Sequence, residues 1–336
     1  MVISRTPFRI SFFGGGTDYP SWYLKHGGAV LATTIDKYCY LTCRYLPPFF
    51  PHLFRVVWSK IETCQSIDEI LHPAVRETLR YLGINSGLSI HHDGDLPARS
   101  GMGSSSAFTV GILHALYALQ GQMISKSQLA QESIYIEQKV LKETVGSQDQ
   151  TSASYGGLNH ITFAQNGEIT VQPLTIKNER AQALNDYLML FYTGIERTAA
   201  DIAQSYVPEI RSKSRQLNSI SEMVDEGIAI LNSNESLIQF GTLLDDAWKA
   251  KRSLSAQVTN PTIDQLYDLV ISAGAIGGKI TGAGGGGFFL VFAEPHHHKK
   301  IREKLNKLIH VPFSFEYSGS QIIFFSNSKI IQKLET

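Results

Sequence analysis

The chain has 336 residues, 43% of them hydrophobic, which is enough apolar material for two domains or one large one. Its 30 basic and 30 acidic side chains balance, so the sequence lacks the basic excess that nucleic-acid and membrane-surface proteins require. No stretch has the roughly 18 apolar residues of a membrane span, and the three cysteines lack metal-binding spacing. We therefore expect a cytoplasmic protein with buried thiols and with no nucleic-acid or membrane partner.

The first expected element is a half-buried strand over Ile3–Phe13, in which apolar side chains alternate with Arg9 and Ser11. Three glycines follow, then Thr17 and Asp18, which together form a tight backbone surface with a carboxylate at its rim. A turn with a helix cap is one interpretation. A polyol pocket is the other, because carboxylates and backbone amides can satisfy several sugar hydroxyls at once.

Further strands are expected over Ala29–Tyr45, Phe54–Ser59 and Ser86–His91. A glycine- and serine-rich loop follows at Asp95–Ala107, before an apolar helix over Phe108–Gln120. Glycines let a backbone approach a ligand closely, and a helix start offers free N–H groups, so phosphate is a suitable ligand. The spacing matches neither the Walker loop nor the dinucleotide fingerprint. A capped helix behind a glycine turn stays open as the alternative.

Two carboxylates follow in distinctive settings. Glu137 falls within the apolar arc of a helix expected over Ser127–Lys142, where an ionised group must be paired, hydrogen-bonded or bound to a metal. A buried salt bridge and a metal site are both open. Asp149 lies in a Gly-Ser-Gln-Asp-Gln run before small residues, a setting that is also common for a helix cap.

The second half begins after a polar stretch at Asn166–Asn185. A strand is expected over Tyr187–Tyr192, and a glycine-rich segment, Gly277–Phe292, ends in a strand and not in the helix of a dinucleotide fold. The histidines at 296–298 are expected to be a solvated surface run at a helix start, with metal binding as the alternative. The remaining expected elements are helices over Ile67–Leu82, Arg197–Tyr206, Ile210–Leu231, Leu237–Ala250, Ile263–Ser272 and Ile301–Leu308, and strands over Phe313–Phe315 and Ile322–Phe325 that complete the second domain.

Three of these stretches resemble, in order, the motifs of the GHMP kinases. Pro7–Tyr19 fits P-x-R-[IV]-x-[LF]-x-G-x-x-T-D-Y, Pro97–Ser106 fits P-x-x-x-G-[LM]-x-S-S-[AS], and Lys279–Gly287 fits K-x-[TS]-G-[AS]-G-x-G-G. The resemblance implies a two-domain α+β fold with the active site in the cleft between the domains. Residues 1–180 would form an N-terminal mixed sheet with helices, including a left-handed β-α-β crossover. Residues 181–336 would form a ferredoxin-like α/β domain, in which the glycine-rich segment Gly277–Phe292 would be a hairpin, called here the glycine hairpin.

The resemblance also assigns roles to residues. Asp149 would be the catalytic base with Arg9 as its matching cation, and Ser105 and Glu137 would bind the Mg²⁺ that accompanies ATP. The implied substrate contacts are Gly15, Gly16, Thr17, Asp18 and Arg197. The implied nucleotide contacts are Pro97, Ser100, Gly101, Met102, Gly103, Ser104, Ser105, Ser106, Gly284 and Gly285.

The finer pattern, which includes Y-T-G-I-x-R-T-A at Tyr192–Ala199, resembles the family branch that phosphorylates the anomeric hydroxyl of heptose 7-phosphate. The product, heptose 1,7-bisphosphate, would feed nucleotide-activated heptose and surface glycans. Arg197 is the first candidate for binding the distal phosphate, with Lys251 and Arg252 behind it. Galactokinases carry a Glu-His pair where this chain has Gly15-Gly16, which argues against galactose.

Two other functions stay open: an anomeric kinase of an unphosphorylated hexose, fucose-like or galactose-like, and a catalytically silent regulator that binds sugar and ATP. The choice between a monomer and a homodimer is also open.

Overall fold

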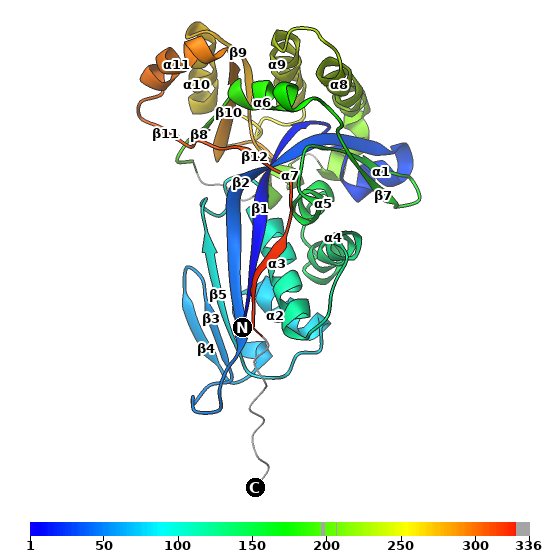
Figure 1. Cartoon of the computed structure of the whole chain (residues 1–336). Helices are drawn as coiled ribbons and strands as arrows, with labels where there is room; N and C mark the ends of the chain where they lie inside the picture. Colours follow the sequence, from blue (N-terminus) through cyan, green and yellow to red (C-terminus); the bar gives the residue numbers. More distant parts are fainter. Residues whose placement is uncertain (196–198, 206, 327–336) are drawn as a thin grey trace.

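The computed structural model describes residues 1–195, 199–205 and 207–326, and its strands form two sheets in two halves of the molecule (Figure 1). The nine-stranded sheet contains β1 (Val2–Phe13), β2 (Gly28–Tyr45), β3 (Phe54–Val57), β4 (Ile61–Cys64), β5 (Leu88–Gly94), β6 (Asn159–Phe163), β7 (Ile169–Pro173), β12 (Phe315–Glu316) and β13 (Gln321–Phe325). The four-stranded sheet contains β8 (Leu188–Tyr192), β9 (Ala275–Ile280), β10 (Phe288–Ala293) and β11 (Ile309–His310). Their strand orders are β13-β1-β2-β5-β3-β4, with β6, β7 and β12 attached through β2, and β11-β8-β10-β9.

The helices fall into two groups along the chain, before and after residue 186. Those of the first 186 residues are α1 (Pro20–His26), η1 (Ile67–Glu69), α2 (Pro73–Tyr81), α3 (Ser104–Leu119), α4 (Lys126–Tyr135), the π-helix η2 (Ile136–Val140), α5 (Gln148–Tyr155) and α6 (Asn178–Asp186). Those that follow are α7 (Ala199–Gln204), η3 (Val207–Lys213), α8 (Ser214–Asn232), α9 (Ile238–Arg252), α10 (Pro261–Ser272), η4 (Pro295–His297) and α11 (His298–Lys304). Figure 1 shows α2, α3, α4 and α5 along one side of the long strands β1, β2 and β5.

Strands β1 and β2 pair antiparallel along the whole length of β1, from Val2 opposite Cys43 to Phe13 opposite Leu31. The apolar helix α3 packs on both strands. Gly111 of α3 permits this close packing, because a Cβ there would lie 3.0 Å from the Thr6 hydroxyl. The strand that carries Arg9 is therefore fixed by a neighbouring strand and by a buried helix.

Aromatic side chains join the two halves. Phe12 and Phe13, at the end of β1, pack edge-on against Phe240 of α9, with ring centroids 5.4 and 5.0 Å apart. Phe240 in turn lies 5.9 Å from the ring of Phe292 on β10. All four rings are at most 1% exposed, so the apolar core is continuous between the two sheets.

One expectation about the second domain is wrong. The C-terminal strands β12 and β13 do not complete it but return to the first sheet, where Phe315 pairs opposite Ile35 and Phe325 opposite Val2. The physical reason is that β13 pairs with the free edge of β1 and β12 with β2, so backbone groups of both strands gain a partner that they would otherwise lack. The division at residue 180 stays a prediction, with this return of the chain added to it.

Helix boundaries also differ from expectation. The helix α3 begins at Ser104 rather than at Phe108, so the serine-rich segment forms its first turn. The helix predicted over Ser127–Lys142 changes to a π-helix at Ile136, and the one predicted over Ile210–Leu231 divides into η3 and α8. The three cysteines are buried and free.

None of the helices in the described ranges is both long enough and apolar enough to cross a membrane.

Candidate active site

Arg9 and Asp149 form a two-pronged ion pair. Arg9 Nε donates to Asp149 Oδ1 and Arg9 Nη2 donates to Oδ2, each over 2.7 Å. Arg9 projects from β1 and is 3% exposed, whereas Asp149 lies in the first turn of α5 with a quarter of its side chain exposed (25%). The guanidinium therefore fixes the orientation of a carboxylate that is still accessible from solvent.

The loop before α3 lies beside this pair. Arg9 Nη1 donates to the carbonyl of Gly101 at 2.8 Å, and the backbone N–H of Arg9 donates to the carbonyl of Met102 at 3.1 Å. Gly103 has φ +74° and is the N-cap of α3, and no side chain caps the helix. The first N–H groups of α3 are thus available to an anion, close to Asp149.

The glycine hairpin of the second sheet contacts the same loop. A Cβ at Gly282 would lie 2.6 Å from the carbonyl oxygen of Gly101, and one at Gly287 only 2.0 Å from that of Ser100. The N–H of Phe288 also donates to the Ser100 carbonyl, at 3.1 Å. These two positions require glycine because backbone meets backbone, and the contact brings both glycine-rich segments to one place.

The predicted nucleotide residues divide by position. Ser100 is buried and donates to the carbonyl of Pro97 at 2.7 Å, and Met102 packs in the core. At the other side of the hairpin, Gly284 and Gly285 pack on Val258 rather than on the loop. The nucleotide contacts remain a prediction, and we add Gly282 and Gly287 to the candidates because they contact the loop.

Of the predicted nucleotide residues in the loop, Pro97 and Ser105 are exposed, Gly101, Gly103 and Ser104 are partly exposed, and Ser100, Met102 and Ser106 are buried.

Glu137 lies fully buried in the π-helix η2, a helix type that is frequent at functional sites. Its Oε2 accepts hydrogen bonds from Ser106 Oγ, at 2.9 Å, and from Gln150 Nε2. Its Oε1 has no hydrogen-bond partner among the described residues. Burial raises the pKa of Glu137 to about 7. A buried carboxylate with one oxygen free, beside the first turn of α3, fits a cation.

The serine that contacts Glu137 is Ser106, whereas the predicted metal ligand Ser105 is exposed. Both hydroxyls lie in the first turn of α3, and spacing in the sequence could not tell which one faces the glutamate.

Asp18 links the first glycine turn to the segment that carries Asp149. Its Oδ1 accepts from the N–H of Gly16 at 3.0 Å, and its Oδ2 accepts from that of Gln148 at 3.3 Å. A Cβ at Gly146 would lie 1.8 Å from Oδ2, so only glycine fits at this position of the loop. Burial raises the pKa of Asp18, and the charge of Asp149 raises it further.

Thr17 is fully buried, and its hydroxyl donates to the carbonyls of Gly14 and Ala29 at 2.8 and 2.9 Å. The structure therefore gives Thr17 a structural role in place of the predicted substrate contact. Gly15 is the partly exposed member of the glycine turn.

The three basic side chains predicted to bind a distal phosphate lie in different environments or outside the described residues. Arg197 lies outside the described residues. Lys251 is 7% exposed and donates to the carbonyl of Gly282, so it supports the glycine hairpin. Arg252 forms an ion pair with Asp264, 3.1 Å away.

Lys279 is a residue that the sequence motif contained but whose role it did not reveal. Its Nζ donates to the carbonyls of Ser11 and Phe12 at 3.0 and 2.7 Å, joining β9 to the strand that carries Arg9. Burial lowers its pKa well below the ordinary value, and the nearby charges of Lys251 and Arg9 lower it further. A lysine within a glycine-rich, otherwise apolar strand was the available signal.

Comparison with known proteins agrees with this architecture. The family model described as GHMP kinases N terminal domain matches residues 69–157, and the one described as GHMP kinases C terminal matches residues 229–310, together half of the chain. A D-glycero-alpha-D-manno-heptose 7-phosphate kinase from Campylobacter jejuni is 29% identical over 331 residues, which cover 91% of this chain and 93% of that protein. An L-fucokinase/L-fucose-1-P guanylyltransferase from Bacteroides fragilis is 26% identical over 91% of this chain and 36% of its own length.

Solved structures share the fold. A D-glycero-D-manno-heptose 1-phosphate kinase from Bacteroides thetaiotaomicron superposes with a TM-score of 0.80 at 22% identity, covering 97% of this chain and all of that one (100%). A mevalonate kinase superposes with a TM-score of 0.72 at 18% identity, covering 95% of this chain and 100% of that one.

The fold, and the glycine-rich segments that meet beside a fixed carboxylate, define an ATP-dependent small-molecule kinase. The chain belongs to the GHMP kinase family, and it is a sugar kinase.

Gly282→Ala should weaken nucleotide binding and lower the Tm, because the new methyl group would push the hairpin away from Gly101. Gly121→Ala is a matched control: both glycines have left-handed φ angles, +65° and +76°, but a Cβ at Gly121 meets no atom within 4 Å. Calorimetric titration with ATP and thermal melts measure both effects. Equal losses in the two variants would show that backbone strain, not the contact with the loop, is responsible.

Glu137→Gln should stabilise the metal-free protein increasingly as the pH rises. The folded state keeps the proton on Glu137 up to about pH 7, whereas the unfolded state releases it near 4.5, so the wild-type protein loses stability as the pH rises through this interval. Melts in chelator between pH 5 and 8 should show the difference in Tm between variant and wild type growing across this range. With the exposed Glu168→Gln as a control, a pH-independent difference would contradict the expectation.

Proposed function

We propose that this sugar kinase transfers the γ-phosphate of ATP to the anomeric hydroxyl of D-glycero-D-manno-heptose 7-phosphate. The product would be heptose 1,7-bisphosphate, a precursor of nucleotide-activated heptose for surface glycans. The observation that carries the transfer chemistry is the Asp149 carboxylate, held by Arg9 beside two glycine-rich segments. The choice of sugar is supported by the Campylobacter jejuni relative, whose similarity extends over nearly the whole of both chains.

In this proposal Asp149 accepts the proton of the sugar hydroxyl as that hydroxyl attacks the phosphoryl group. The two hydrogen bonds from Arg9 fix the carboxylate, and the buried guanidinium supplies positive charge near the transferring group. The free N–H groups at the start of α3 bind phosphate oxygens. Asp18 holds the loop before α5 and thereby sets the position of Asp149 relative to the sugar.

Magnesium fits the buried carboxylate of Glu137, whose Oε1 is free, and the hydroxyls of Ser105 and Ser106 on the facing turn of α3. When bound, the ion would supply positive charge that offsets the negative charge developing on the phosphates during transfer.

A second candidate, the anomeric phosphorylation of a free hexose, is favoured by the similarity to the Bacteroides fragilis L-fucokinase. A silent sugar and ATP sensor is the third candidate, and the intact pair of Arg9 and Asp149 argues against it.

Release of ADP from Mg-ATP across a sugar panel tests the proposal. The panel contains heptose 7-phosphate, mannose 6-phosphate, and free mannose, galactose and fucose. We expect turnover with heptose 7-phosphate and little with the free sugars. Turnover with a free hexose alone would refute the heptose assignment but keep the kinase, and sugar binding without turnover would favour the sensor.

The same panel tests the role of Arg197. Arg197→Ala should weaken the binding of phosphorylated sugars far more than the binding of free sugars. Equal losses of affinity for both kinds of sugar would show that Arg197 does not bind the distal phosphate.

Asp149→Asn should leave nucleotide affinity nearly unchanged and lower kcat by at least ~10²-fold, the scale of general-base catalysis. The amide keeps an oxygen for Arg9 but has lost the basic carboxylate. Single-turnover kinetics and nucleotide titration measure the two quantities separately. A variant that retains full turnover would exclude Asp149 as the base.

A further inference from the structure

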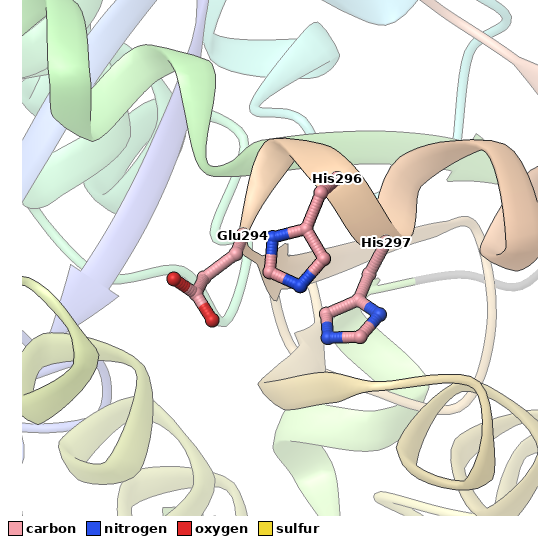
Figure 2. A group of neighbouring side chains, drawn as sticks. All are labelled: Glu294, His296 and His297. Atoms are coloured by element: carbon pink, nitrogen blue, oxygen red, sulfur yellow. The ribbon is translucent and has the colours of Figure 1, made fainter.

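The turn between β10 and α11 brings together three side chains that the kinase site does not use. Glu294, His296 and His297 place their potential ligand atoms within 4.8 Å of one another (Figure 2). The turn is ordered by a backbone hydrogen bond of 2.9 Å from the N–H of His297 to the carbonyl of Glu294. We propose that this turn binds a divalent cation of the zinc class. Metal binding is the alternative that the sequence leaves open for this histidine run.

The three side chains are available as ligands. Within the described ranges, none of them makes a side-chain hydrogen bond or an ion pair. The next histidine differs, because His298 Nε2 lies 3.1 Å from the carbonyl oxygen of Ala293. The metal would therefore displace no polar partner at Glu294, His296 or His297.

The ring of His297 is held in place by its surroundings. A Cβ at Gly274, in the turn between α10 and β9, would lie 2.5 Å from His297 Nδ1, so the ring packs directly on that glycine backbone. The rings of His296 and His297 are neighbours, with centroids 4.0 Å apart. His296 is exposed and Glu294 is half-buried, so both can rotate toward an ion.

The donor set selects the metal. Two imidazole nitrogens and one carboxylate oxygen suit zinc, which binds such groups at about 2.0–2.2 Å and completes its coordination with water. Ligand atoms 4.8 Å apart must move closer to reach one ion, which rotation of Glu294 and His296 can achieve. Magnesium prefers oxygen ligands alone, so this turn and the carboxylate of Glu137 would take different ions.

The location defines the consequence of binding. Strand β10 runs from the glycine hairpin to this turn, and His297 contacts the α10–β9 connection through Gly274. A bound ion would cross-link the start of η4 and hold α11 and the end of β10 against that connection. We expect it to stabilise the second half of the protein without altering the chemistry beside Asp149.

Zinc binding to the purified full chain tests the inference. The chain is stripped with chelator, excess magnesium is added to saturate oxygen-rich sites, and zinc is titrated against a chromophoric chelator. We expect one zinc equivalent that magnesium does not displace, together with a higher Tm. His296→Ala and Glu294→Gln change accessible side chains and should each lower the affinity at least ~10-fold. His298→Ala is the matched control and should bind zinc as the wild type does.

Two outcomes would overturn the inference. One is the absence of zinc binding by the wild-type chain. The other is equal zinc affinity in the wild type and in the double variant Glu294→Gln/His296→Ala, which would place the ion elsewhere. Because these variants leave the packed ring of His297 in place, loss of folding does not explain a lost affinity, and their melts without zinc should match the wild type.

Discussion

The ion pair between Arg9 and Asp149 joins parts of the chain that are 140 residues apart, and the site is built around it. Arg9 is 3% exposed, and a buried guanidinium is costly without a charged or hydrogen-bonding partner. Arg9 finds two partners, the carboxylate of Asp149 and the carbonyl of Gly101. This requirement fixes a strand, a helix start and the loop before α3 in a single arrangement. Removing either charge would disturb all three.

Close backbone contacts then add the second half of the protein. Gly282 and Gly287 lie against the loop before α3 where no side chain would fit. Lys279 reaches across to the carbonyls at the end of β1, just before the glycine turn that Asp18 secures. The contacts between the two halves are thus of several kinds: aromatic packing, a buried lysine side chain and glycine backbone. Each of these contacts involves a residue of the loop before α3 or a residue close to Arg9 in the sequence.

The sequence predicts the elements whose signal is local. Alternation along β1 identified the strand of Arg9, and the apolar arc around Glu137 identified a carboxylate that is indeed fully buried. The order of the motifs identified the family, and the two family models, which together match half of the chain, confirm it. In each case the signal is the periodicity or the spacing of side chains that lie close together in the sequence.

What the sequence could not supply depends on contacts between distant residues. Strands β12 and β13 look like a continuation of the second domain, and only the unpaired edges of the first sheet explain why they return. Which of the two hydroxyls, that of Ser105 or that of Ser106, contacts Glu137 depends on how α3 is rotated against the π-helix η2. The motif predicts that Thr17 contacts the substrate, but the Thr17 hydroxyl is hydrogen-bonded to backbone carbonyls instead.

The most direct measurement is a crystal structure of the chain with magnesium and a non-hydrolysable ATP analogue. We expect phosphates between the first turn of α3 and the hairpin at Gly282, a metal on Glu137, and the γ-phosphate facing Asp149. A nucleotide bound away from the two glycine-rich segments, or with Asp149 turned from the γ-phosphate and unpaired from Arg9, would contradict this arrangement.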